Sequence, residues 1–328
     1  MDGGDGLQNG EDLWVLCPSY RDVASFTILR SKIQESIGRA PPTGRFPLRF
    51  VVVDDTGGLD PDIEQLAKFS DCTVITPPFN LGHQRAIVFG LRKLLPQLRD
   101  QDVIVTMDAD GEDQPEDVPR LLAPLAGSLS ALCVARRTER QESLKFRTMY
   151  VMFRLMFRTM TGTTVRSGNF AAYRGWLAKR ILMHPYFDLC YSSTLVSLDV
   201  GVIPVPCARG TRYAGRSRMN MLRLLMHGVR MLMPFTDRIA VRALSAFSVL
   251  FGLGIVLAAV VVGVRVFTAA AIPGWTTFTV LGSLVLSVVA LGNFLVLFAV
   301  ISHSRGVSLA NVEEWNDGSA GGPPTSSD

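Results

Sequence analysis

The sequence predicts an α/β domain built on a mostly parallel sheet, followed by an amphipathic helix and a two-helix transmembrane hairpin. Three observations predict this architecture. Short apolar segments alternate with helix-length segments from Leu13 to Ala135, as in a series of βαβ units. Two of the apolar segments end in pairs of acidic residues, and two long uncharged segments lie near the C-terminus.

The expected elements follow one another in a regular order along the first part of the chain. Strands are expected at 13–17, 49–53, 73–75, 103–107 and 131–135. Helices are expected at 21–37, at 61–69, at 80–98 with Asn80 as the cap, and at 115–126. This alternation favours a parallel sheet that is covered by helices on both faces.

The most informative segment is Val103–Asp110, in which an apolar strand delivers Asp108 and Asp110 to its carboxyl end. Residues two apart in a strand point the same way, and paired carboxylates suit Mg²⁺ or Mn²⁺ that holds a diphosphate. A second apolar strand ends in Asp54 and Asp55. Open α/β sheets bind ligands at this edge, which favours a nucleotide site. Acidic residues after strands are also ordinary turn formers, so either pair alone leaves that alternative open.

Composition indicates that part of the chain meets lipid. Of the 328 residues, 48% are hydrophobic, and the mean hydropathy of +0.26 is high for a soluble protein. The segments Ala243–Val264 and Val266–Ser302 carry no charge, and Pro273-Gly274 interrupts the second. Each can cross a bilayer as a helix. A buried helical pair in a soluble protein is the alternative, but neither segment has a polar face.

Basic residues flank these two segments and predict their orientation. Arg238 and Arg242 precede the first span, and His303 and Arg305 follow the second. Basic flanks stay in the cytosol, so both termini and the α/β domain are expected there. The expected boundaries are 1–12 for a disordered N-terminus, 13–215 for the α/β domain, 216–235 for the amphipathic helix, 236–304 for the spans and 305–328 for a disordered tail.

The five cysteines lack metal-site spacing and are expected to be packing residues.

The segment before the first span is strongly basic. Between Arg209 and Arg242 there are eight arginines and one acidic residue, Asp237. On a helix from about Arg216 to Met233, the basic residues form a narrow stripe beside a wide apolar face, as in helices that lie at a lipid headgroup layer. A juxtamembrane anchor with no role in binding is an equally good interpretation. Phe146–Arg158 has a similar pattern, although core packing with exposed arginines also explains it.

Four motifs in register from Leu13 to Arg242 resemble those of family 2 glycosyltransferases. They are Pro18-Ser19-Tyr20, Val53-Asp54-Asp55, Asn80-Leu81-Gly82-His83 with Ala86 and Gly90, and Asp108-Ala109-Asp110 with Pro115-Glu116. Later features resemble the polyprenyl-phosphate subgroup, which includes dolichyl-phosphate mannose synthases and undecaprenyl-phosphate glucosyltransferases. These features are Arg136-Arg137, Ser167-Gly168-Asn169-Phe170, Arg212 with Gly215, Ser217 and Arg218, and the two spans.

The resemblance implies a GT-A fold and an inverting, Mg²⁺- or Mn²⁺-dependent transfer from a UDP- or GDP-sugar to a polyprenyl phosphate at the cytosolic face of the cell membrane. It implies catalytic roles for Asp110, Asn169, Arg136 and Arg137. It implies metal binding by Asp108 and Asp110, and substrate binding by Pro18, Tyr20, Asp54, Asp55, Asp108, Arg212, Arg216, Ser217 and Arg218. Glu112, which departs from the family pattern, is expected to add charge to the metal site, with a side chain that points to solvent as the alternative. For Arg136 and Arg137, a solvated basic turn is an equally good explanation. No nucleic-acid partner is expected, and a homo-oligomer is left open.

The sequence departs from the family pattern at several positions. Asn169 stands where bacterial lipid-linked relatives often have Asp, and Glu112 stands where Gln is usual. An amide cannot be a general base, whereas a phosphate acceptor is already an anion and needs none. Asn169 therefore fits a lipid-phosphate acceptor, and it would also fit a damaged enzyme. Three alternatives stay open: transfer to a lipid or glycan hydroxyl, elongation of a polysaccharide, and a catalytically idle sugar-nucleotide-binding scaffold. Two spans cannot line a channel, which disfavours elongation.

Overall fold

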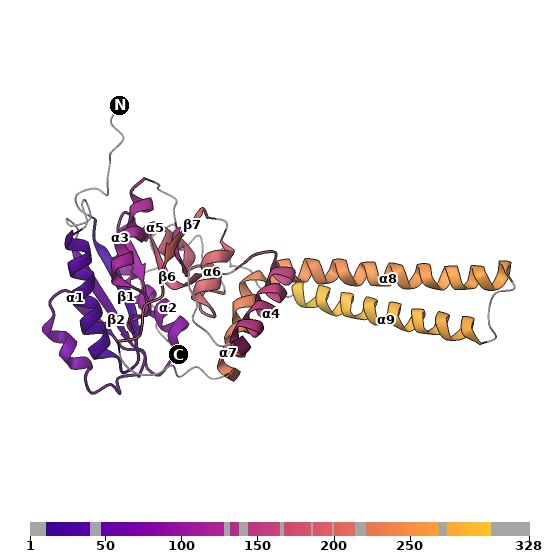
Figure 1. The fold of residues 1–328 in the computed structure, drawn as a ribbon, viewed down its shortest axis with the longest axis horizontal. Coiled ribbons are helices and arrows are strands. Elements are labelled where there is room, and N and C mark those ends of the chain that lie inside the picture. Colours follow the sequence, from indigo (N-terminus) through magenta and orange to yellow (C-terminus); the bar gives the residue numbers. More distant parts are fainter. Residues whose placement is uncertain are drawn as a thin grey trace, which may run out of the picture. The chain divides into compact units, whose positions relative to one another are not determined.

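The computed structural model describes residues 11–39, 47–127, 132–137, 144–164, 167–184, 186–198, 200–213, 221–268 and 274–302 (Figure 1). The described residues fall into two compact units, one within 11–154 and 164–234 and the other within 155–163 and 235–302. The predicted disordered tail and nearly all of the predicted disordered N-terminus lie outside the described residues.

The first unit is built on a seven-stranded sheet in the order β3-β2-β1-β4-β6-β5-β7. The strands are β1 (Leu13–Ser19), β2 (Leu48–Asp54), β3 (Cys72–Ile75), β4 (Val103–Thr106), β5 (Leu132–Arg137), β6 (Ser167–Arg174) and β7 (Val202–Cys207). Only β6 runs antiparallel to its neighbours in this sheet, and every other pairing is parallel. The predicted α/β class with a mostly parallel sheet is confirmed, while β6 and β7 were not predicted.

Helices cover both faces of this sheet. The α-helices of the first unit are α1 (Val23–Arg39), α2 (His83–Leu94), α3 (Val118–Leu122), α5 (Gly175–Ile181), α6 (Tyr191–Ser197), α7 (Met221–Leu232) and most of α4 (Leu144–Thr161). Helices α1 and α3 contribute to one hydrophobic cluster, and α2, α5 and α6 contribute to the other. Successive strand residues alternate between these clusters: Val15 and Val105 belong to the first, and Leu16 and Ile104 to the second.

Several predicted helices differ from the observed ones. Asn80 does not cap α2, because the N-cap is Gly82, whose φ of 80° turns the chain just before the helix begins. The α-helical hydrogen bonding stops at Leu94, and a 3₁₀ turn, η3 (Leu95–Gln97), contains Pro96, which has no N–H to continue the helix. The helix expected at 61–69 is a 3₁₀ helix, η2 (Ile63–Lys68). The helix expected at 115–126 is split into η4 (Pro115–Asp117), α3 and η5 (Ala123–Gly127).

The predicted packing role of the cysteines agrees with their positions. All five are free thiols; four are buried, and Cys72 is partly buried. Burial raises the pKa of the Cys72 and Cys133 thiols to about 11, so these groups are protonated at neutral pH.

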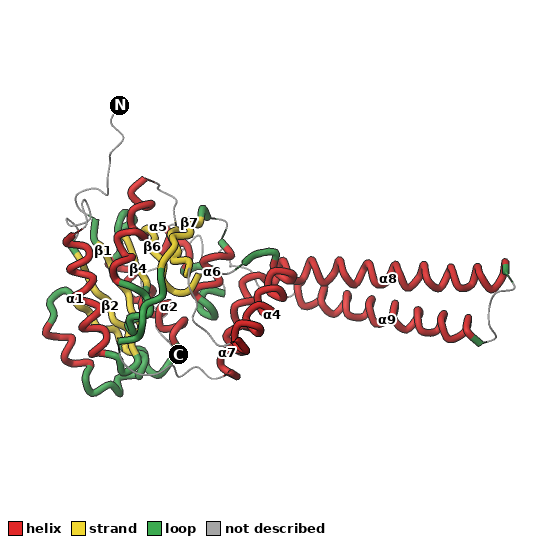
Figure 2. Tube along the Cα trace, viewed as in Figure 1, coloured by secondary structure: helices red, strands yellow, loops and turns green. Residues whose placement is uncertain are grey.

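The second unit contains two long helices that run side by side (Figure 2), α8 (Thr236–Phe267) and α9 (Trp275–Ser302). Both are long and apolar enough to cross a membrane, as the sequence predicts. They approach closely where Gly254 faces α9, because a Cβ atom at Gly254 would lie 3.1 Å from the Ser283 carbonyl oxygen. The end of α4 packs against the start of α8, where the Phe157 and Phe235 rings meet edge to face at 5.4 Å.

Candidate active site

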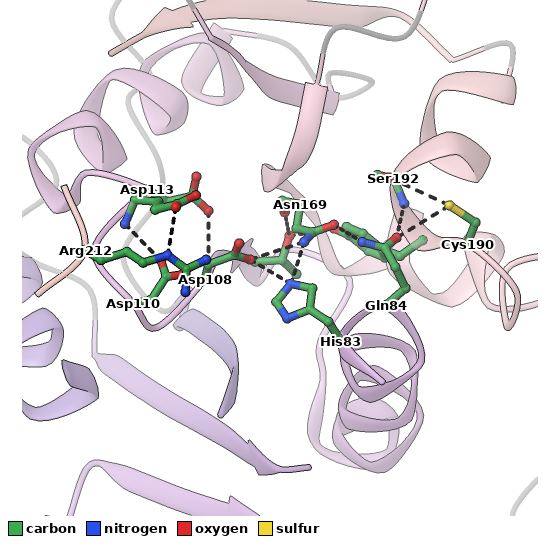
Figure 3. A network of polar contacts seen from close by, with 12 residues as sticks. His83, Gln84, Asp108, Asp110, Asp113, Asn169, Cys190, Ser192 and Arg212 are labelled. Carbon is green, nitrogen blue, oxygen red and sulfur yellow. Dashed lines mark hydrogen bonds and ion pairs between the residues drawn. The ribbon is translucent and has the colours of Figure 1, made fainter. Parts of the chain in front are cut away.

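The carboxyl ends of β1, β2 and β4 lie beside one another, because these strands are parallel and adjacent. The loop after β4 carries Asp108, Asp110 and Glu112, all of which are partly buried. Asp113 is only 4% exposed, and its Oδ2 accepts a hydrogen bond from the Asp108 backbone N–H at 3.0 Å. The Glu112 N–H similarly donates to Asp110 Oδ1 at 3.0 Å. The acidic loop is thus held by its own carboxylates, and Asp108 lies near the centre of the network of polar contacts (Figure 3).

Arginines pair with one side of this loop. Arg212 Nη2 lies 3.0 Å from Asp110 Oδ2, and Arg212 Nε donates to Glu112 Oε1 at 2.9 Å. Arg209 Nη2 donates to the other oxygen, Glu112 Oε2, at 2.7 Å. Desolvation raises the pKa of Asp110, and the charge of Asp108 adds to this effect. Burial also acts to raise the pKa of Glu112, but its hydrogen bonds to the two arginines outweigh burial and lower it.

Backbone contacts place these arginines. The Tyr213 N–H donates to the Asp110 carbonyl oxygen, and the Gly210 N–H donates to that of Glu112, both at 2.9 Å. Gly111 has a φ of 90°, and a Cβ atom there would lie 2.7 Å from the Tyr213 ring. A glycine is therefore needed for segment 209–213 to lie along the acidic loop.

An amide side chain and an imidazole side chain contact the Asp108 carboxylate, on the side of the acidic loop away from the arginines. Asn169, on β6, donates from Nδ2 to Asp108 Oδ1 at 3.2 Å, and His83 Nε2 lies 2.8 Å from the same oxygen. Thr106, at the end of β4, donates to the Asn169 carbonyl oxygen at 2.7 Å. Gln84 Nε2 donates to Asn169 Oδ1. Desolvation lowers the pKa of His83, but the charge of Asp108 and the hydrogen bond to it raise the pKa above its usual value.

The acidic residues after β2 have different surroundings. Asp54 is fully buried, and its carboxylate accepts hydrogen bonds from the N–H groups of Thr56 at 3.1 Å and Gly58 at 3.2 Å. Asp54 thus holds its own turn. Asp55 Oδ1 accepts a hydrogen bond from the Leu81 N–H at 2.7 Å, which ties this turn to the segment before α2. Burial raises the pKa of Asp55.

The structure describes some of the remaining candidate residues, and others lie outside the described part. Pro18 lies at the end of β1, Tyr20 follows it and is 40% exposed, and Arg136 is exposed at the end of β5. The side chain of Arg137 lies outside the described part, as do Arg216, Ser217 and Arg218. The roles inferred for all candidate residues stay predictions.

Four residues that were given no role in the sequence analysis belong to this site: His83, Gln84, Asp113 and Arg209. A sequence signal existed for the first two, because they open a helix that follows a glycine, and helix N-termini at a sheet edge often face ligands. Asp113 and Arg209 had no such signal. They are paired in an isolated antiparallel bridge between segments that are far apart in the sequence.

The acidic loop carries the residues that are predicted to hold a metal ion. Within the described residues, no group of three or more His, Cys, Asp or Glu side chains is arranged to hold a metal ion. Asp108 and Asp110 nevertheless have suitable chemistry, because they are hard oxygen donors and the charge of Asp108 raises the pKa of Asp110. A cation would relieve that repulsion. Glu112 is committed to the two arginines.

Comparison with known proteins gives three findings. Residues 33–182 match the family model described as glycosyl transferase family 2. The chain is 24% identical over 273 residues to an undecaprenyl-phosphate 4-deoxy-4-formamido-L-arabinose transferase of Pectobacterium carotovorum, covering 78% of this chain and 77% of that protein. Glucosyl-3-phosphoglycerate synthase from Mycobacterium tuberculosis, solved with Mn²⁺, UDP and glucosyl-3-phosphoglycerate, has 18% identity and a TM-score of 0.46, covering 70% of this chain and 80% of that one.

Proposed function

We propose that this chain, whose residues 33–182 match the glycosyl transferase family 2 model, transfers a sugar from a UDP- or GDP-sugar to a polyprenyl phosphate. The observation that carries the proposal is the pairing of Asp108 and Asp110 at the carboxyl edge of the sheet with an amide, Asn169, beside them. The relative from Pectobacterium carotovorum, by its name, acts on undecaprenyl phosphate, which supports a lipid phosphate as the acceptor.

The donor is proposed to bind over the ends of β1, β2 and β4. Pro18, Tyr20 and Asp55 would contact the base and ribose, and Asp108 and Asp110 would hold Mg²⁺ or Mn²⁺. When bound, the metal would neutralise the charge that develops on the leaving nucleoside diphosphate. Among the residues of the chain, Arg212 is already beside Asp110 and could pair with a phosphate when a substrate enters.

The proposed reaction needs no general base. An oxygen of the acceptor phosphate attacks the anomeric carbon, and the bond from that carbon to the diphosphate oxygen breaks with its electron pair on the diphosphate. The attacking oxygen is already ionised at neutral pH, so no proton has to be removed. Asn169 can donate a hydrogen bond in such a site but cannot accept a proton usefully, which agrees with this acceptor class.

The apolar C-terminal helices support a lipid acceptor. Helices α8 and α9 are apolar enough to span a bilayer, and Met226, Val229 and Met233 are exposed at α7 and the turn after it. Apolar side chains next to basic ones suit a helix at the headgroup layer, where the phosphate of a polyprenyl lipid lies. We propose that the α/β domain and both termini face the cytosol.

The test is nucleotide release from UDP- and GDP-sugars by the purified full-length chain, with Mn²⁺, in the presence and absence of polyprenyl phosphate. The proposal requires release that depends on the metal and on the lipid phosphate, together with transfer of radiolabelled sugar to the lipid. Release with a hydroxyl acceptor but not with the phosphate would assign another acceptor class. Nucleotide binding without any transfer would identify a scaffold.

A further inference from the structure

Side-chain amides connect α6 to Asp108 (Figure 3). The Ser192 backbone N–H donates to Gln84 Oε1 at 3.0 Å. Gln84 Nε2 donates to Asn169 Oδ1, and Asn169 Nδ2 donates to Asp108 Oδ1 at 3.2 Å. These three hydrogen bonds, which we call the amide relay, join residues from α6, α2, β6 and the acidic loop.

The polarity of the amide relay is fixed at both ends. A backbone N–H can only donate, so the oxygen of Gln84 faces Ser192 and its NH₂ group faces Asn169. The oxygen of Asn169 must then face Gln84, which leaves its NH₂ group for Asp108. An ionised carboxylate can only accept, so the NH₂ group of Asn169 is the correct partner for Asp108. Reversing either amide would place two donors or two acceptors against each other.

The structure assigns to Gln84 a role as a positioning residue: it orients the Asn169 amide as a donor to Asp108 and thereby fixes the Asp108 carboxylate for donor-substrate binding. This inference rests on the proposed function. It explains why residue 169 is an amide, since a carboxylate in this orientation would face Asp108 with a like charge. His83 Nε2 lies 2.8 Å from the same oxygen of Asp108 and 2.5 Å from Asn169 Nδ2. Without a proton it accepts from the Asn169 amide, and with a proton it donates to Asp108.

A single substitution separates this role from a structural one. Gln84→Glu keeps the side-chain length and the acceptor for the Ser192 N–H, but it replaces the donor to Asn169 with an acceptor. We expect Mn²⁺-dependent UDP or GDP affinity and kcat/KM to fall about tenfold, the size of a lost hydrogen bond to a charged group. The KM for polyprenyl phosphate should stay unchanged. Gln97→Glu, the same change at an exposed position after α2, is the matched control and should behave as wild type.

If Gln84 only bridges α2 to α6, Gln84→Glu will retain wild-type affinity and Gln84→Ala alone will lose it. That result would overturn the inference. Gln84→Glu also adds a negative charge to the site, and this effect needs a control. In an Asn169→Ala background the same charge is added, but the amide that links residue 84 to Asp108 is absent. The relay requires Gln84→Glu to cause no further loss there, whereas additive losses would contradict it.

Wild type, Gln84→Glu, Asn169→Ala and the double variant form a double-mutant cycle. Measuring the Tm of these four proteins without ligand tests the relay even in the absence of substrate. Coupling between Gln84→Glu and Asn169→Ala in Tm is expected, and full additivity would overturn the relay. Wild-type protein that binds neither UDP nor GDP in the presence of Mn²⁺ would refute the proposed function instead. The two failures are therefore distinguishable.

Discussion

The two sides of the acidic loop are held in different ways. On the side of Asp110 and Glu112, the contacts are ion pairs with Arg209 and Arg212, whose side chains are each 33% exposed. On the side of β6 and α2, Asp108 is contacted by an amide and an imidazole, and the amide continues through Gln84 to a backbone N–H in α6. The first may be called the charged side and the second the amide side.

The difference teaches how each side tolerates change. An ion pair depends mainly on charge and distance, so partly exposed arginines can move and still stabilise a carboxylate. An amide has a donor end and an acceptor end, so each link of the amide relay depends on direction as well as distance. A substitution that keeps size but changes polarity on the amide side should therefore have a larger effect than removing the charge of Glu112 on the charged side.

The largest effect is expected at Asp110, because this residue is proposed to hold the metal ion. Asp110→Ala should lower transfer activity by about a hundredfold or more, because removing a carboxylate leaves the diphosphate charge poorly neutralised. Circular dichroism should show an unchanged fold. The control is Asp188→Ala, which removes an exposed carboxylate paired with Arg92. Full activity of Asp110→Ala, or of the wild type in EDTA, would contradict the metal assignment.

Asn169→Asp tests the amide side directly by replacing the donor to Asp108 with a like charge. We expect kcat/KM with the lipid-phosphate acceptor to fall about tenfold, the size of a lost hydrogen bond to a charged group. The measurement is steady-state kinetics with both substrates varied. A rise of about a hundredfold, which is the low end for installing a general base, would show that a hydroxyl acceptor limits the enzyme.

Arg216 and Arg218 follow Arg212 in the sequence and lie outside the described residues. Replacing both Arg216 and Arg218 with Gln should raise the KM for polyprenyl phosphate several-fold and leave UDP or GDP affinity nearly unchanged. Calorimetry beside acceptor titrations would measure both quantities, with Arg39→Gln as a control at an exposed arginine. Lost nucleotide binding with an intact acceptor KM would make this loop a donor-side lid.

The smallest effect is expected for Glu112→Gln, which installs the residue type expected at this position from the resemblance to family 2 glycosyltransferases. Glu112 pairs with two partly exposed arginines, and such pairs contribute little. The free energy of unfolding should therefore change by less than about 1 kcal/mol, as measured by chemical denaturation in detergent. A loss several times larger would show that the charged side depends on geometry as strictly as the amide side.

The sequence predicted the parallel half of the sheet and the two long apolar helices, because periodicity and length signal these elements directly. It did not predict β6, which carries Asn169, or β7. Whether a strand is inserted antiparallel between two others depends on pairings with distant segments, which local patterns do not encode. The two strands that were not predicted, β6 and β7, lie on either side of β5 in the part of the sheet beyond β4.

The candidate site, like the sheet, was predicted only in part. Asp108 and Asp110 were found because their spacing follows from strand geometry. The partners of these residues were not found, because Arg209 reaches Glu112 across 97 residues and Gln84 reaches Asn169 across 85. Side-chain links of this range arise only once the fold has brought the segments together, so a single sequence gives no pattern for them.

The position of β6 has a consequence for the order in which the chain can fold. In the sheet, β6 lies between β4 and β5, although it is synthesised after both. Until β6 emerges, one edge of β4 has no strand to pair with, and β5 and β7 cannot join the sheet. The half that contains Asp55, Asp108 and Asp110 can therefore assemble early in translation. Its Asn169 partner arrives only after α4 has been made, and Arg209 and Arg212 arrive later still, after β7.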